Sequence, residues 1–311
     1  MTAAALATLA LACAVGAWRL TRARWTYRAP HVAIVLWQAL GVTWGLAGTG
    51  ALLGYALEPY GRGVLHGLAG FAASAFGGGE AGQGAPLPYD LPRIVALIAG
   101  LTALAVLIMV LLAAGLQTFR ARQRHRTLLA LIAREDPVVP GVRVLDHPGA
   151  TAYCVPGLRS QVVVSEGALK LLSADELTAV LAHETAHVRE RHDLVLLPFA
   201  ALRRALPWSR VVKDAQSEVG LLVEMAADDV ARRYCSPRRL ATALLRFGTA
   251  GAVPAPRGAL GAATSSSAAV MARVERLVTP GPILPLGVRY AIVAFSVTLT
   301  TSAPLLWLIP H

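Results

Sequence analysis

Four long apolar segments constrain the fold of this chain more than any other feature of its sequence. They comprise residues 2–18, 31–57, 94–118 and 288–309, and the third of them contains no charged residue. A helix needs about 20 apolar residues to cross the hydrocarbon core of a bilayer. The sequence therefore predicts a mainly α-helical membrane protein with about four transmembrane helices, of which the first is the shortest.

Basic residues are distributed unevenly between the loops that join these segments. Arginine clusters follow the first and third segments, whereas the Gly/Ala/Pro-rich stretch 58–93, which we expect to be mobile, has two arginines against three acidic residues. Cytoplasmic loops of membrane proteins carry an excess of Lys and Arg. We therefore expect a multi-pass cell-membrane protein with both termini and the 58–93 stretch outside the cytoplasm. The clusters are Arg19, Arg22, Arg24 and Arg28, and Arg120, Arg122, Arg124 and Arg126.

The net charge of +11 does not by itself indicate a nucleic-acid-binding protein. It comes almost entirely from arginine, since Lys170 and Lys213 are the only lysines. Neither a recognition motif nor a platform of aromatic and basic residues accompanies the charge, so direct nucleic-acid binding is not expected. Charged residues make up 15% of the chain, against about a quarter in soluble domains, which again favours a membrane protein.

The stretch between the third and fourth apolar segments is long enough for one domain. The predicted organisation is a membrane region at 1–118, a cytoplasmic domain at 119–286 and a last membrane helix at 287–311. Ser173 and Glu176 form a capping box that begins a helix ending at about Arg191. The other predicted elements are strands at 142–145 and 161–164, helices at 217–234 and 268–278, and a flexible Gly/Ala/Ser/Pro-rich loop at 248–268.

The helix after Ser173 carries the sequence His183-Glu184-Thr185-Ala186-His187. Two histidines four residues apart lie on one face of a helix, so both imidazoles can reach a single Zn²⁺ ion. Glu184 projects beside that position and can take a proton from a water molecule whose pKa the metal has lowered. The pattern also occurs by chance in unrelated helices, so it needs further ligands to be specific.

The predicted helix at 217–234 supplies a third ligand in Glu224, with Asp228 one turn later. An Asp at that position can accept the N–H of a ligating histidine and fix its tautomer. The alternative is a charged helix face with two solvated histidines. The apolar surroundings of both motifs argue against it, because ionisable groups in apolar helices are costly unless they are paired or metal-bound.

Residues from about 142 to 278 resemble the gluzincin metallopeptidases of bacterial membranes. The resemblance is strongest to the BlaR/MecR antirepressor family, and the HtpX/CAAX-endopeptidase family comes next. It rests on "LTAVLAHETAHVRERHD" at 177–193, "EMAADDVA" from Glu224 and "RVERL" from Arg273. HtpX-type enzymes carry a His-Pro pair shortly before the position of Arg273, where this chain has serines at 265–267. That difference favours the antirepressor family. The matching stretches also include 154–157 and 161–169.

The resemblance implies an α+β zincin-like metallopeptidase domain inserted before the last transmembrane helix, with one Zn²⁺ per chain. His183, His187 and Glu224 correspond to zinc ligands, Glu184 to the catalytic base and Asp228 to the residue that orients a ligand. It also implies that an edge strand pairs with an extended substrate, although an ordinary buried strand fits the sequence equally well. That strand comprises Gln161, Val162, Val163, Val164 and Ser165.

The donor that would stabilise a peptide oxyanion is less well defined. Arg273, His192 and Tyr234 are the candidates. For His192 the favoured alternative is a cationic residue near a helix C-terminus, and for Arg273 a structural salt bridge is an equal alternative.

The leading functional hypothesis is a membrane zinc endopeptidase that cleaves a protein or peptide at the cytoplasmic face. Resemblance to the antirepressors suggests a DNA-binding repressor as substrate, which would make the chain part of signal transduction. One alternative is an HtpX-like protease for membrane-protein quality control. Another is a non-catalytic receptor or scaffold that retains the zinc fold, against which the intact Glu184 argues.

Overall fold

The computed structural model describes residues 2–61, 63–76, 90–135, 142–155, 161–249 and 267–308, and these are mostly helical. Within this described part, four helices are long and apolar enough to cross a membrane, as predicted. They are α1 (Thr2–Leu20), α2 (Pro30–Ala56), α4 (Leu91–Ile132) and α11 (Leu286–Leu308).

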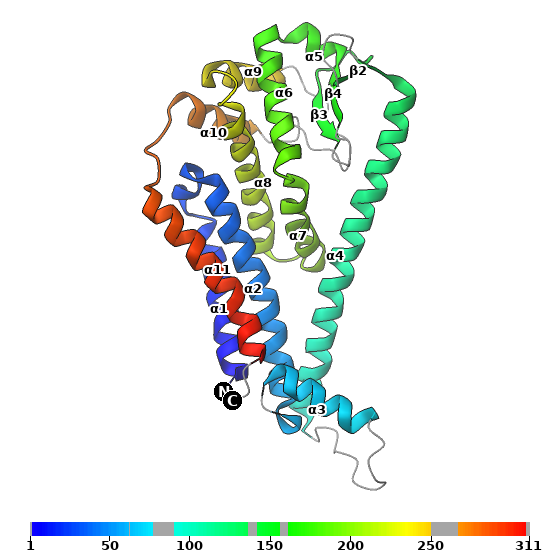
Figure 1. Ribbon diagram of the computed structural model, residues 1–311, viewed down its shortest axis with the longest axis vertical. Helices are drawn as coiled ribbons and strands as arrows, with labels where there is room; N and C mark the ends of the chain where they lie inside the picture. The colour runs from blue at the N-terminus through cyan, green and yellow to red at the C-terminus, as the bar shows by residue number, and fades with distance from the viewer. Residues whose placement is uncertain are drawn as a thin grey trace.

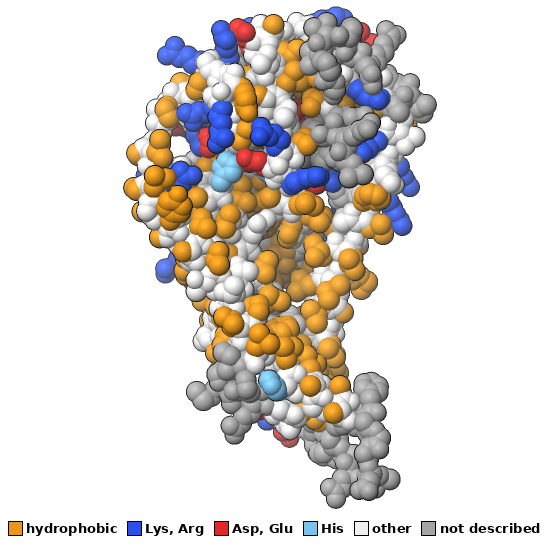
Figure 2. All heavy atoms as spheres, in the orientation of Figure 1, with side chains coloured by type: hydrophobic (Ala, Val, Ile, Leu, Met, Phe, Trp, Pro, Cys, Tyr) orange, Lys and Arg blue, Asp and Glu red, His pale blue; other side chains and the backbone are white. Residues whose placement is uncertain are grey.

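The molecule is elongated, and α4 runs along most of its length (Figure 1). Both termini lie at one end, together with α3 (Val64–Phe76). The sheet lies at the other end, and blue Lys and Arg side chains gather there, while hydrophobic side chains cover much of the surface along the spans (Figure 2).

Three features of the membrane region differ from the sequence prediction. The helix α3 forms within the stretch predicted as a mobile loop, of which residues 77–89 lie outside the described part. The helix α4 continues without a break past the predicted boundary at residue 118. Two short 3-10 helices, η1 (Arg24–Arg28) and η2 (Glu58–Tyr60), border α2.

The inserted domain contains a four-stranded sheet in the order β1-β2-β4-β3. The predicted strands β2 (Val142–Leu145) and β4 (Gln161–Ser165) are present and pair in parallel. The strands β1 (Ala133–Glu135) and β3 (Ala152–Val155) were not predicted and pair antiparallel with them. The edge position predicted for Gln161–Ser165 is therefore wrong, because β2 and β3 take the backbone hydrogen bonds on both sides of β4.

Most of the predicted helices of this domain are present with different bounds. The capping box begins α6 at Ala174, but α6 ends at Arg189 and a new helix, α7, begins at His192. The next helix, α8, begins at Arg210 because Ser209 caps its first turn. Most of the predicted loop at 248–268 lies outside the described residues. The bounds are α5 Glu166–Leu171, α6 Ala174–Arg189, α7 His192–Ala205, α8 Arg210–Ala231, α9 Pro237–Thr249 and α10 Ser267–Val278.

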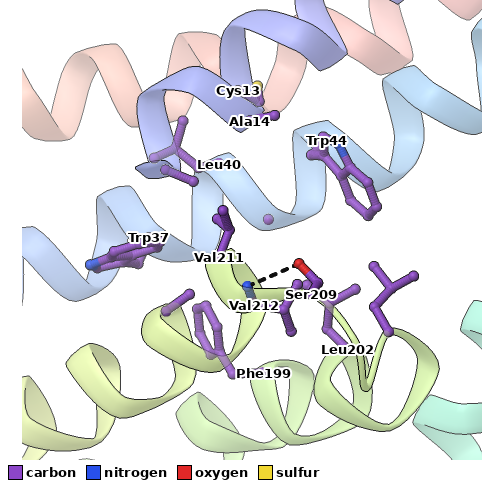
Figure 3. A pocket seen from close by; sticks show the side chains of 14 residues that line it. Cys13, Ala14, Trp37, Leu40, Trp44, Phe199, Leu202, Ser209, Val211 and Val212 are labelled. Carbon is purple, nitrogen blue, oxygen red and sulfur yellow. Dashed lines mark hydrogen bonds between the residues drawn. The ribbon is translucent and has the colours of Figure 1, made fainter. Parts of the chain in front are cut away.

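The membrane region and the inserted domain share a hydrophobic core. Buried residues of α1 and α2 pack against α7 and α8, and the Trp37 and Phe199 rings meet edge to face with centroids 6.5 Å apart. An apolar cavity of about 230 Å³ lies between these four helices. Figure 3 shows its aromatic lining and the N-terminal cap of α8, in which the Val212 N–H donates to the Ser209 hydroxyl. None of the predicted site residues lines this cavity.

An ion pair with a buried carboxylate connects α4 with α7. Arg122 Nη1 on α4 lies 2.9 Å from Asp193 Oδ2 on α7, and the Asp193 side chain is 3% exposed. Replacing Arg122 with alanine leaves a buried carboxylate without this cation, which costs about 3–5 kcal/mol of unfolding free energy. We expect a correspondingly lower denaturation midpoint for the purified protein in detergent. Arg120→Ala is the control, because Arg120 is exposed on the same helix; equal midpoints for the two variants would contradict this role.

Candidate metal centre

The helix α6 brings the predicted catalytic and ligating residues onto its buried face. His183, Glu184 and His187 are at most 1% exposed. Ala179 and Val180, one turn before the motif, are also buried. The motif therefore faces the protein interior, and this is where α6 packs against α8.

The three predicted ligands converge on one point. The Nε2 atoms of His183 and His187 lie 3.1 Å apart. Glu224 Oε2 lies 3.4 Å from His183 Nε2, and Glu224 Oε1 lies 3.5 Å from His187 Nε2. One ligand atom from each residue lies within 4.8 Å of the others. Two imidazole nitrogens and one carboxylate oxygen at this spacing form a donor set suited to a divalent transition metal.

Asp228 and Arg273 surround this cluster. Asp228 Oδ1 lies 3.0 Å from His183 Nδ1. The distance suits a hydrogen bond, but the angle between the two groups does not. Arg273 on α10 is fully buried and donates to both Asp228 oxygens at 2.8 and 2.7 Å. Its Nη1 donates to Glu224 at 2.9 Å. The forked contact with Asp228 is the geometry that guanidinium and carboxylate groups favour.

Burial and neighbouring charges shift the pKa values of these groups in different directions. Burial opposes the charged form of His183, but the carboxylates of Asp228 and Glu224 outweigh it and raise its pKa to about 9. Burial lowers the pKa of His187 to about 3. Burial opposes ionisation of Glu224, yet Arg273 is the main influence that lowers its pKa to about 2. The pKa of Asp228 is also lowered, against the effect of burial, chiefly by Arg273.

The charges of the buried cluster fit a divalent cation. Glu184, Glu224 and Asp228 contribute three negative charges when ionised, and Arg273 contributes one positive charge. With both imidazoles neutral, as binding of a metal requires, the cluster carries two excess negative charges, whereas a proton on His183, whose pKa is raised to about 9, would leave one. A buried group of this kind requires compensation, and a divalent ion held by the three converging ligands provides it.

The structure separates the three candidate oxyanion donors. Arg273 forms buried salt bridges with Glu224 and Asp228, which is the structural role that the sequence favoured equally with a catalytic one. Tyr234 lies beyond the end of α8 and is 61% exposed, and its hydroxyl accepts from Arg189. His192 lies near the C-terminal end of α6, as its alternative interpretation had it, but it is the first residue of α7 and 2% exposed, and burial lowers its pKa, which disfavours the cationic form.

Sequence reasoning missed two polar residues next to the cluster. Glu190 caps the end of α6 and lies 3.0 Å from His192, and His31 at the start of α2 contacts the same carboxylate. No sequence signal connects Glu190 with His31, because they are 159 positions apart.

Helices able to cross a membrane, together with a His–His–Glu cluster beside a further carboxylate, are features that a membrane metallopeptidase requires. Residues 116–245 match the model for peptidase family M48. The match includes His183, Glu184, His187 and Glu224 and ends before Arg273.

Three curated relatives are each described as a protease HtpX homolog. The Aeropyrum pernix protein is 40% identical over 78 residues, 23% of this chain and 24% of its own length. The Nostoc protein is 35% identical over 91 residues, 28% and 31% of the two chains. The Thermoplasma acidophilum protein is 34% identical over 74 residues, 23% of each. The matches thus span a quarter to a third of these relatives; they support the HtpX resemblance, and the BlaR/MecR resemblance is not confirmed.

Proposed function

We propose that this chain is an integral-membrane, zinc-dependent endopeptidase that hydrolyses protein substrates at the cytoplasmic face. The observation that supports it most strongly is the convergence of His183, His187 and Glu224 beside Glu184 within the M48-matching region. The arginine clusters support a cytoplasmic peptidase domain at 119–286, membrane regions at 1–118 and 287–311, and extracytoplasmic termini.

In this proposal His183, His187 and Glu224 hold one Zn²⁺, and Asp228 orients His183. When bound, the ion polarises the scissile carbonyl and makes a nearby water molecule more acidic. Glu184 accepts the proton of the attacking water and passes it to the leaving amine. Its complete burial holds the carboxylate in place for both transfers.

Strand addition remains part of the proposal, at a different strand. The edge strand β3 (Ala152–Val155) packs against α6, whereas β4 is interior. An extended peptide added along β3 would run beside the helix that carries Glu184. We therefore assign substrate pairing to β3 rather than to Gln161–Ser165.

The similarity to proteins described as HtpX proteases supports proteolysis, and we keep two candidate roles: quality control of membrane proteins and regulatory cleavage of a DNA-binding repressor. The two substrates predict different products. Many fragments from an unfolded membrane protein support the first, and a single cut in a repressor supports the second. If the protein is a non-catalytic scaffold, the metal-loaded protein should yield neither kind of product.

Metal removal tests the proposed chemistry. We expect a chelator to abolish hydrolysis of a casein-type substrate by the purified protein, and stoichiometric Zn²⁺ to restore it. The ligands are protein side chains that stay in place, so the loss should be reversible. Hydrolysis that survives complete removal of metal would contradict the proposed mechanism.

A further inference from the structure

A chain of hydrogen-bonding side chains leads from the candidate metal centre to the start of α2. His187 Nδ1 lies 2.9 Å from His192 Nδ1. On its other side, His192 Nε2 lies 3.0 Å from Glu190 Oε2. His31 Nε2 lies 3.0 Å from the same oxygen. The histidines on α6 and α7 are buried, while the Glu190 and His31 side chains are 30% and 43% exposed, so the chain connects the interior with the surface.

The break between α6 and α7 creates the contact between the first two rings. Five residues along a continuous helix correspond to a rotation of about 500°, which would place His187 and His192 about 140° apart around the axis. Arg191 adopts a left-handed conformation with φ 50°, which changes the direction of the polypeptide backbone between the two helices. As a result, the two rings meet edge to face with centroids 4.8 Å apart.

The ligand geometry fixes the direction of each hydrogen bond. His187 Nε2 faces the other two ligands, so its proton must be on Nδ1 when Nε2 binds a metal. That N–H donates to His192 Nδ1, which leaves the N–H of His192 Nε2 to donate to Glu190. His31 Nε2 donates to the same carboxylate. At each contact between these side chains, one atom thus donates a hydrogen bond and the other accepts it.

We propose that His192 and Glu190 are positioning residues for the metal ligand His187, and that His31 anchors them to the membrane helix α2. The proposal rests on the metal centre of the proposed function. A hydrogen bond to the second ring nitrogen of a ligating histidine fixes its tautomer and orientation and raises its basicity. Asp228 on α8 lies beside the second ring nitrogen of His183, whereas the second ring nitrogen of His187 contacts a series of side chains that ends on α2.

Zinc affinity of the full-length protein in detergent, measured by competition with a chromophoric chelator, tests this role without reference to peptidase activity. We expect His192→Leu to weaken Zn²⁺ binding by about 10–100-fold, the range found for such outer residues. His192→Gln should bind within a few-fold of wild type, because its carbonyl can accept from His187 and its amide can donate to Glu190. His66→Ala is the control, since His66 is exposed on α3.

A double-mutant cycle distinguishes a connected chain from independent structural effects. Glu190→Ala should weaken Zn²⁺ binding by itself, but it should have little further effect in the His192→Leu background, because both changes interrupt one chain. Additive losses, or a His192→Leu protein that binds Zn²⁺ like wild type, would overturn the proposal. Because Glu190 is partly exposed, its variant remains informative if His192→Leu fails to fold. A wild-type protein that binds no Zn²⁺ would instead overturn the proposed function.

Discussion

Glu184→Gln is expected to reduce peptide-bond hydrolysis by about 10²–10⁴-fold, the usual contribution of a general base, without loss of the metal. Glutamine has the shape of glutamate but cannot accept the proton of the attacking water. The three ligands that converge on the metal position do not include Glu184. The measurement is the initial rate of casein-type hydrolysis together with the zinc content of the same preparation.

Glu275→Gln is the matched control for this substitution, because Glu275 is exposed on α10. It should leave both rate and zinc content unchanged. A Glu184→Gln protein that cleaves at the wild-type rate would contradict the assignment of the base. A Glu184→Gln protein without metal would instead indicate that Glu184 is a ligand.

Arg273→Ala is expected to produce the largest loss of stability among single substitutions at the site. Arg273 is fully buried and contacts both Asp228 and Glu224. Removing it leaves two carboxylates without their cation, and breaking one such buried pair already costs about 3–5 kcal/mol. Zinc affinity should fall as well, because Asp228 would no longer be held beside His183. Chemical denaturation of the purified protein measures the first effect and chelator competition the second.

Two further variants separate this role from direct participation in catalysis. Arg273→Lys retains the charge but loses the fork, so it should recover part of the stability. Arg238→Ala removes an exposed arginine from α9 and should change neither property. A stable, zinc-loaded Arg273→Ala protein with slow hydrolysis would instead support the role of an oxyanion donor.

The elements predicted correctly depend on local signals. Each transmembrane span is a continuous run of apolar residues, and the start of α6 is specified by Ser173 and Glu176, three positions apart. The errors have non-local or conformational causes. The interior position of β4 depends on pairing with β3, whose four residues carry little pattern. The break before α7 depends on the backbone conformation of Arg191, a residue type that is common within helices.

The same distinction applies to the site. The four-residue spacing of His183 and His187 puts both on one helical face, and the spacing of Glu224 and Asp228 does the same on α8. That the two pairs meet across α6 and α8 was predicted from the ligands that a metal site needs, because no local pattern in the sequence indicates it. The contact of His31 with Glu190 depends on how α2 packs against the inserted domain, which no spacing in the sequence specifies.

The most direct test of the central claim is the zinc content of purified wild-type and His187→Ala proteins, measured by mass spectrometry alongside hydrolysis. The proposed centre predicts about one zinc per wild-type chain. It predicts little zinc and no hydrolysis for His187→Ala. A wild-type protein that hydrolyses substrate without zinc, or a His187→Ala protein that retains both, would contradict the account.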